Sequence, residues 1–149
     1  MYVDHVAIMR KRGNLLDKIV LGKKTIESRW YVNKIAPWNK IKAGDTIYFK
    51  ESSEDVTARA TVSKVLQYEL TSQITKNIIK KYGNLIDPGT SRKDFFKWGK
   101  EQKKRYCILL FLSNVEKIKP FSIDKTGYGI SSAWMCMGDI NSVVKRTRP

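Results

Sequence analysis

The most regular pattern in this chain is the alternation of small apolar and polar side chains over residues 56–65. Alternation with a period of two is typical of a strand with one buried face. The apolar positions carry only small side chains, those of Val56, Ala58, Ala60 and Val62. Small inward-facing residues suit the tight curvature of a small barrel. The segment therefore predicts a curved strand in a β-barrel.

A second constraint is the continuous apolar run over residues 106–112, which has the length of a strand. A run without alternation indicates a central strand covered on both faces. Further strands are predicted over residues 2–9, from residue 26 onward, over 46–50 and over 131–137, and helices over 15–21, 71–83 and 93–104. This pattern predicts an α+β fold, a small mixed barrel with helices packed at its ends.

Capping residues indicate where the first two helices begin and end. Asn14 and Thr71 are expected N-caps, because their side chains can accept a hydrogen bond from an N–H of the first turn. Asp17 partly fills the capping-box position after Asn14. Gly22 and Gly83 are expected to end these helices, with Gly22 in the left-handed conformation.

The length of 149 residues suits a single domain, 1–149, with one core. The residues from about 142 to 149 form a basic C-terminal tail that we expect to be loosely held. No apolar run approaches the ~20 residues that span a bilayer, and the N-terminus lacks the features of a signal peptide. We therefore expect a cytoplasmic protein that does not bind membranes, and a monomer.

The charge of the chain points to a polyanionic partner. The formal net charge is +15 and the sequence pI is about 9.9. Nucleic acid is the commonest polyanion inside a cell, so RNA or a nucleotide is the expected partner. The alternative is a lysine-rich proteome, in which the charge only keeps the protein soluble.

Metal and cofactor chemistry is not expected. The chain has one histidine, His5, and two cysteines, Cys107 and Cys136, which lie far apart in apolar runs. Buried free thiols explain both cysteines, and this set of residues is too small for a zinc site. A Ser-His-Asp mechanism would require His5 to reach a cleft.

Residues 22–30 carry the pattern that bears on function. In a strand, Glu27 and Arg29 lie on the same face, and Ile26 and Trp30 lie on the other, where a core would bury them. The charged pair can be an exposed ion pair that contributes little stability, or it can line a cleft. Lys24 is expected beside this pair, because the helix ends at Gly22.

Two loops and one helix combine aromatic or flexible residues with cations. The segment 31–39 carries Tyr31, Lys34 and Trp38, which can stack bases and follow phosphates, although Trp38 can equally pack back on the barrel. Two glycines flank Tyr128, and they permit close approach of a ligand. The cations of residues 97–105 are either a solvated helix face or part of a phosphate-binding track.

Residues 22–29, with the sequence GKKTIESR, fit the pattern G-x-K-x-x-E-x-R. The chain thereby resembles the ASCH domain (activating signal cointegrator homology), a member of the PUA-like superfamily of RNA-associated barrels. The turn at residues 42–45 and the segment 127–134 also resemble that family, so the likeness covers nearly the whole chain.

The resemblance implies a cleft that binds RNA or a modified nucleoside. Lys24, Glu27 and Arg29 would line it, with Lys24 and Arg29 pairing with phosphate or carbonyl oxygens and Glu27 accepting from an amino-bearing base edge. Nearby aromatic side chains would stack a base, and the candidates are Trp30, Tyr31, Tyr128 and Trp134.

An enzyme is the alternative function. One branch that resembles this family hydrolyses the acetyl amide of N4-acetylcytidine, with a threonine at the position of Glu27, and ribonuclease activity has also been proposed in the family. Here a metal-independent hydrolase would use Glu27 as the general base and Lys24 to polarise the carbonyl or phosphate. We favour binding, because the threonine hydroxyl is missing. A third possibility is a protein-interaction module whose charge is incidental.

Overall fold

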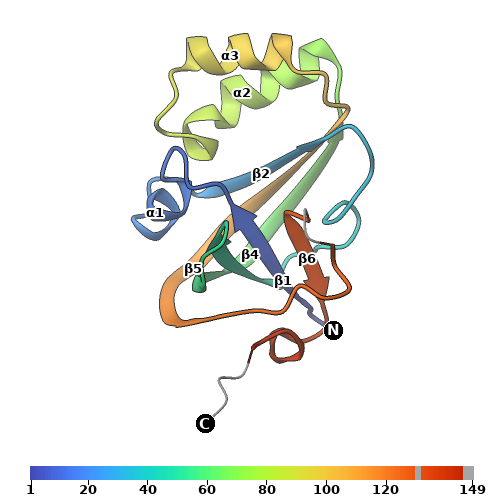
Figure 1. Ribbon diagram of the computed structural model, residues 1–149. Coiled ribbons are helices and arrows are strands. Elements are labelled where there is room, and N and C mark those ends of the chain that lie inside the picture. The colour runs from blue at the N-terminus through green and yellow to red at the C-terminus, as the bar shows by residue number, and fades with distance from the viewer. Residues whose placement is uncertain (130–131, 146–149) are drawn as a thin grey trace.

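The computed structural model describes residues 1–129 and 132–145, and it shows a curled sheet with a layer of two helices on one side (Figure 1). The strands are β1 (Asp4–Met9), β2 (Ile26–Tyr31), β3 (Thr46–Glu51), β4 (Val56–Glu69), β5 (Tyr106–Phe121) and β6 (Trp134–Met137). The helices are α1 (Leu15–Val20), α2 (Ser72–Ile86), α3 (Arg92–Glu101) and the short 3-10 helix η1 (Ile140–Ser142). The predicted α+β class is confirmed. No helix of the described segments is long and apolar enough to cross a membrane.

The sheet is mixed, as predicted, but it is not a closed barrel. Its strand order is β2-β5-β4-β3-β1-β6, with β1 and β3 parallel and the other neighbouring pairs antiparallel. Register shifts in the β4–β5 ladder let these long strands bend, as bulges do. Strands β2 and β6 are the edges, so the curled sheet leaves one side open between them.

Strand β4 confirms the alternation that predicted it. Val56, Ala58, Ala60 and Val62 are all at most 1% exposed. The strand continues to Glu69, four residues beyond the predicted end, because it stays paired with β5. Strand β5 likewise extends to Phe121, well past the apolar run, because its second half stays paired with β4. This half is only partly buried, so its sequence is not continuously apolar.

The apolar half of β5 is covered on both faces, as predicted. Ile108 and Leu110 belong to the core inside the curled sheet, and Cys107 and Leu109 to the core beneath α2 and α3. Gly83 does not end α2, which continues to Ile86. The glycine packs against α3, since a Cβ at this position would lie 3.4 Å from the Phe95 ring.

Of the predicted caps of the first two helices, Thr71 and Gly22 are confirmed and Asn14 is wrong. Thr71 caps α2 by accepting a hydrogen bond from the Ile74 N–H at 3.1 Å, and Gly22 adopts the expected left-handed conformation after α1, with φ +78°. Asn14 does not cap α1: it has φ 52° and its side chain makes no capping bond. The tight turn that brings the Asn14 N–H to the Lys11 carbonyl places Asn14 in this conformation.

The C-terminal predictions need correction. Residue 131 lies outside the described residues, and the last strand, β6, covers only Trp134–Met137. Residues 146–149 of the expected tail also lie outside them. Residues 142–145 are not loose: Val143 is buried, Val144 forms a bridge with Ile123, and the Lys145 N–H donates to the Ser122 carbonyl at 2.8 Å.

His5 lies in the core rather than in a cleft. The Trp134 indole N–H donates to its Nδ1 at 3.0 Å, so the ring proton is on Nε2, which donates to Asp45 at 2.9 Å. Burial lowers the pKa of His5 even though Asp45 opposes that shift, so the imidazole is neutral. The Asp45 carboxylate also accepts from the N–H groups of Val3 and Lys42, and it thereby fixes the start of β1 against β3.

We expect Asp45→Asn to lower the free energy of unfolding by about 2–3 kcal/mol, because the new amide places a donor against buried N–H groups. Urea unfolding measures this change. The control is Asp17→Asn at an exposed position of α1, which should change stability by less than about 0.5 kcal/mol. Equal effects of the two substitutions would contradict this account of Asp45.

Candidate functional site

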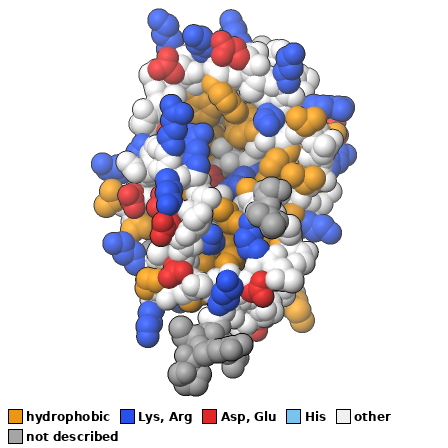
Figure 2. Space-filling model, viewed as in Figure 1, with side chains coloured by type: hydrophobic (Ala, Val, Ile, Leu, Met, Phe, Trp, Pro, Cys, Tyr) orange, Lys and Arg blue, Asp and Glu red, His pale blue; other side chains and the backbone are white. Residues whose placement is uncertain are grey.

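A pocket of about 530 Å³ lies over the free edge of β2, between the curled sheet and α3. We call it the edge pocket. Its polar and aromatic lining residues are Arg10, Lys24, Glu27, Ser28, Arg29, Trp30, Tyr31, Asp87, Thr90, Phe95, Trp98 and Lys104. Figure 2 shows this hollow below the helical layer, with hydrophobic side chains on its walls and Lys and Arg side chains around it.

Strand β2 lines the edge pocket from both of its faces. Glu27, Arg29 and Tyr31 project on one side, and Trp30 projects on the other, toward the core under the helices. The predicted alternation of β2 is therefore observed. The pocket also contains residues from the opposite face because it wraps around an edge that no neighbouring strand covers.

The free edge of β2 carries backbone groups that face the pocket. In an antiparallel ladder, alternate residues direct their N–H and C=O toward the partner strand. The Leu112 N–H donates to the Thr25 carbonyl, so Glu27 and Arg29 face β5, and Ser28 and Trp30 face the open edge. Glu27 accepts from the Ser28 N–H at 2.9 Å, which leaves the Ser28 carbonyl and the Trp30 N–H directed at the pocket.

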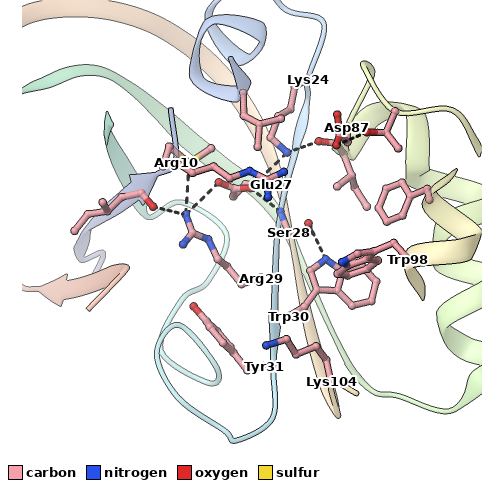
Figure 3. Close-up of a pocket in the computed structure, with 16 residues that line it drawn as sticks. Arg10, Lys24, Glu27, Ser28, Arg29, Trp30, Tyr31, Asp87, Trp98 and Lys104 are labelled. Atoms are coloured by element: carbon pink, nitrogen blue, oxygen red, sulfur yellow. Dashed lines mark hydrogen bonds and ion pairs between the residues drawn. The ribbon is translucent and has the colours of Figure 1, made fainter. Parts of the chain in front are cut away.

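Lys24 lies beneath the floor of the edge pocket and is 1% exposed. Its ammonium donates to the carbonyls of Ile26, at 2.7 Å, and Ile86, and lies 3.4 Å from the Glu27 carboxylate (Figure 3). Burial lowers the pKa of Lys24, and Glu27 opposes that shift. An ammonium has three N–H donors, and these three acceptors use them all.

Glu27 is buried but ionised. Burial by itself would raise its pKa, but the Lys24 ammonium, the Arg29 guanidinium and the Ser28 N–H together hold the pKa below its usual range. Arg29 Nη2 lies 3.3 Å from Oε2. Each carboxylate oxygen has two acceptor positions, so Oε2 retains one for a further donor.

Arg29 closes the open side of the curled sheet. Its guanidinium donates to the carbonyls of Ile8, at 3.4 Å, and Ala133, at 3.2 Å, and lies over the Trp134 ring at 5.1 Å from its centroid. These partners belong to β1, to β6 and to the residue before β6. Arg29 thus joins the β2 edge to the β1–β6 edge where no ladder does.

These contacts change the role expected for the two cations of the motif. Lys24 has no N–H left for a phosphate, and the Arg29 donors are largely used by protein carbonyls. The pairing of Lys24 with a ligand phosphate stays a prediction, and in this structure the ammonium is fully used within the protein. The motif builds the floor of the pocket, and Glu27 is its member with an unused acceptor.

Aromatic rings form one wall of the edge pocket. Trp30 and Trp98 meet edge to face, with ring centroids 5.0 Å apart, and Phe95 supports Trp98 from within α3 at 5.6 Å. Trp98 is 39% exposed, unusually high for so large an apolar ring. Figure 3 shows Trp30 and Trp98 together on the side of the helical layer, with Tyr31 across from them.

Arg10 and Lys104 supply exposed cations at the rim of the pocket. Arg10 follows β1, and Lys104 precedes β5 (Figure 3). Within residues 1–129 and 132–145, neither side chain forms an ion pair. Both therefore have donors available for an anion.

Four of the aromatic and basic residues singled out by the sequence do not line this pocket. Trp38 packs on the core and against Tyr106, with ring centroids 5.1 Å apart, so the alternative in which it packs back on the barrel is the observed one. Lys34 lies over the same two rings and near Glu69. Tyr128 packs on the core beside Ile123, and Trp134 is 4% exposed beneath Arg29.

Sequence reasoning missed Arg10, Trp98 and Lys104 as pocket residues. In the sequence, Arg10 is one residue of a basic turn and Lys104 is one of many cations. The spacing of Trp98 from Phe95 fits an apolar helical stripe, which indicates a packing face rather than a pocket wall. Nothing local in the sequence places α3 beside β2.

As for metals, no group of three or more His, Cys, Asp or Glu side chains in the described residues is placed to hold an ion.

Comparisons with known proteins identify the fold. Neither the protein-family models nor the curated proteins give a match to the sequence. Among solved structures, the ASCH protein from Zymomonas mobilis superimposes with a TM-score of 0.64 at 14% identity, covering 96% of both chains. Two variants of that protein give TM-scores of 0.61 and 0.62 at 15% and 16% identity, covering 89% of this chain and 88% and 86% of theirs. This chain therefore has the ASCH fold, as the motif predicted.

Replacing Lys24 should be far more costly than replacing its neighbour. Lys24→Met keeps the length of the side chain but leaves two buried carbonyls without this donor and removes one of the two cations beside Glu27, so we expect a loss of about 3–5 kcal/mol in the free energy of unfolding. Lys23→Met, at an exposed position one residue earlier, is the matched control and should be nearly neutral. Similar losses in urea unfolding for both variants would contradict the structural role of Lys24.

The stability that Glu27 provides should depend on pH. Its pKa is lowered in the folded chain, so its contribution is complete above the unfolded value of about 4.5 and is lost as the pH falls through the folded pKa. We therefore expect the stability difference between the wild type and Glu27→Gln to be constant near neutral pH and to shrink below pH ~4.5. The measurement is urea unfolding as a function of pH. Glu116→Gln, which removes an exposed carboxylate, is the control, and a difference of the same size at pH ~3 and ~7 would refute the assignment.

Proposed function

We propose that this chain binds RNA and accommodates one unpaired or modified base in the edge pocket. The observation that carries the proposal is the combination of an exposed aromatic wall, a hydrogen-bonding floor and free rim cations in one pocket of about 530 Å³. A nucleotide has the matching parts: a flat ring, a polar edge and an anionic phosphate. The volume lies within the range usual for small-molecule sites.

The aromatic wall supports the stacking of a base. The exposed surface of Trp98 lies beside Trp30 and faces the pocket. Stacking of a base on an aromatic side chain contributes about 1–3 kcal/mol and tolerates any base identity. An exposed tryptophan at a pocket wall is otherwise unfavourable, so a planar ligand explains its position.

The floor supports the reading of a base edge. Glu27 offers an ionised acceptor, and the Ser28 carbonyl and Trp30 N–H at the free β2 edge offer one further acceptor and one donor. The acceptors match an exocyclic amino group, and the Trp30 N–H can donate to an adjacent unprotonated ring nitrogen. An amino-bearing base therefore fits this floor better than uracil does.

The rim supports the binding of a phosphate. Arg10 and Lys104 lie outside the buried motif and form no ion pair within the described residues. The net charge of +15 adds long-range attraction for a polyanion. The preference for RNA over DNA rests on the resemblance to the RNA-associated ASCH family, whose fold this chain shares.

Binding is better supported than hydrolysis. A general base works best with a pKa near the working pH, whereas the pKa of Glu27 is held below its usual range. Lys24 has no N–H left to polarise a carbonyl or phosphate. Both residues are therefore better suited to a fixed floor than to proton transfer.

Substitution of Trp98 tests the proposal. We expect Trp98→Ala to weaken the binding of nucleoside monophosphates about tenfold, because a stacking surface is lost, and Trp98→Phe to retain most of the affinity. Isothermal titration calorimetry with AMP, CMP, GMP and UMP measures these affinities and should give UMP the weakest binding. Tyr2→Ala removes an exposed ring outside the pocket and is the control.

Two results would overturn the proposal. One is equal affinity of wild type and Trp98→Ala for all four nucleotides. The other is release of acetate from N4-acetylcytidine, or of shorter products from RNA, by the wild type but not by Glu27→Gln, which would favour the hydrolase.

A further inference from the structure

A second cavity has a volume of about 760 Å³ and lies between the first turns of α2, the end of α3 and the turn that leads into β5. It lies on the other side of the helical layer from the aromatic wall of the edge pocket. We call it the hairpin cavity. Its lining is mixed: most of the lining residues are polar or charged, and the half-buried Phe96 contributes an apolar ring. No function discussed above uses it.

Three lysines from three different segments converge on the hairpin cavity. Lys76 comes from α2, Lys100 from α3 and Lys104 from the turn before β5, and all three are exposed. In the part of the chain that the structure describes, none of them forms an ion pair. Three uncompensated like charges around one cavity repel one another, and an anion would relieve that repulsion.

The segment that surrounds the hairpin cavity is strongly basic. Residues 72–105 contain ten Lys or Arg and only three Asp or Glu, a net +7 of the total +15. Polyanions release counterions when they bind such a surface, and this release supplies much of the affinity of proteins for nucleic acids. The charge favours a nucleic acid over an uncharged or apolar partner for this surface.

Lys104 lines both cavities. The edge pocket and the hairpin cavity therefore share one lining residue, a cation in the turn that leads into β5. A single nucleic-acid strand fits this arrangement, because it alternates phosphates with bases. One base would occupy the edge pocket, the following phosphate would contact Lys104, and the next nucleotides would occupy the hairpin cavity.

We propose that the strand whose base enters the edge pocket continues past Lys104 into the hairpin cavity, where Lys76 and Lys100 contact its backbone phosphates. The ligand is then a single-stranded RNA segment rather than a free nucleoside. A neighbouring nucleotide would pack its ring on the half-buried side chain of Phe96. This inference rests on the proposed function of the edge pocket.

The double substitution Lys76→Ala with Lys100→Ala tests this proposal, because neither residue lines the edge pocket. We expect it to weaken the binding of a fluorescein-labelled eight-nucleotide single-stranded RNA about tenfold and to leave the binding of AMP, measured by calorimetry, unchanged within about twofold. The slope of log K against log salt should also become shallower by about 1.4 if each lysine neutralises one phosphate.

The matched control is Lys117→Ala with Lys119→Ala, which removes two exposed lysines of β5 outside both cavities. This double variant lowers the net charge by the same amount. It should therefore reproduce only the loss of RNA affinity that comes from weaker long-range electrostatic attraction. The inference alone fails if the two double variants weaken RNA binding equally, or if wild type binds the oligonucleotide no more tightly than AMP. The proposed function itself fails if Trp98→Ala changes neither RNA nor AMP binding.

Discussion

The structure depends on a small network of buried charges around one strand. Lys24 ties the carbonyl of Ile86, at the end of α2, to the start of β2, and Arg29 ties β2 to carbonyls of β1 and the β6 side. Glu27 lies between the two cations and compensates both. An isolated buried charge is very costly, but here every charge has opposite charges or carbonyl dipoles as partners. The network thus joins the two edges of the open sheet, which backbone hydrogen bonds between β2 and β6 would join in a closed barrel.

This arrangement separates the residues that build the pocket from those that can contact a ligand. The two cations of the motif are used inside the protein, so the anionic part of a ligand must be met by Arg10 and Lys104 at the rim. Glu27 combines both roles, because its charge is fixed by the network while one oxygen keeps an unused acceptor position. The free backbone edge of β2 adds donors and acceptors that no side-chain motif encodes.

Part of the net positive charge lies on the helical layer, beside the two cavities. A net charge of +15 spread evenly would favour polyanions anywhere on the surface. A net +7 of it belongs to residues 72–105, which include α2, α3 and the following turn, and the two cavities open beside these helices. The two alternatives for the cations of residues 97–105 therefore separate by position: Lys100 and Lys104 line cavities, whereas Lys97 and Lys103 line neither.

Patterns between near neighbours in the chain were sufficient to predict the strand at residues 56–65, the doubly covered start of β5, the left-handed Gly22 and the common face of Glu27 and Arg29. They were sufficient because period, conformation and facing depend on residues only a few positions apart. Only the tertiary structure placed Lys24 against Ile86, 62 positions away, Arg29 against Ala133, 104 positions away, and Trp98 against Trp30. A sequence pattern indicates that a side chain will be buried or that a cation needs an acceptor, but not which distant segment supplies the contact. That choice follows from the strand order, which leaves β2 at an edge beneath α3 and so creates the pocket.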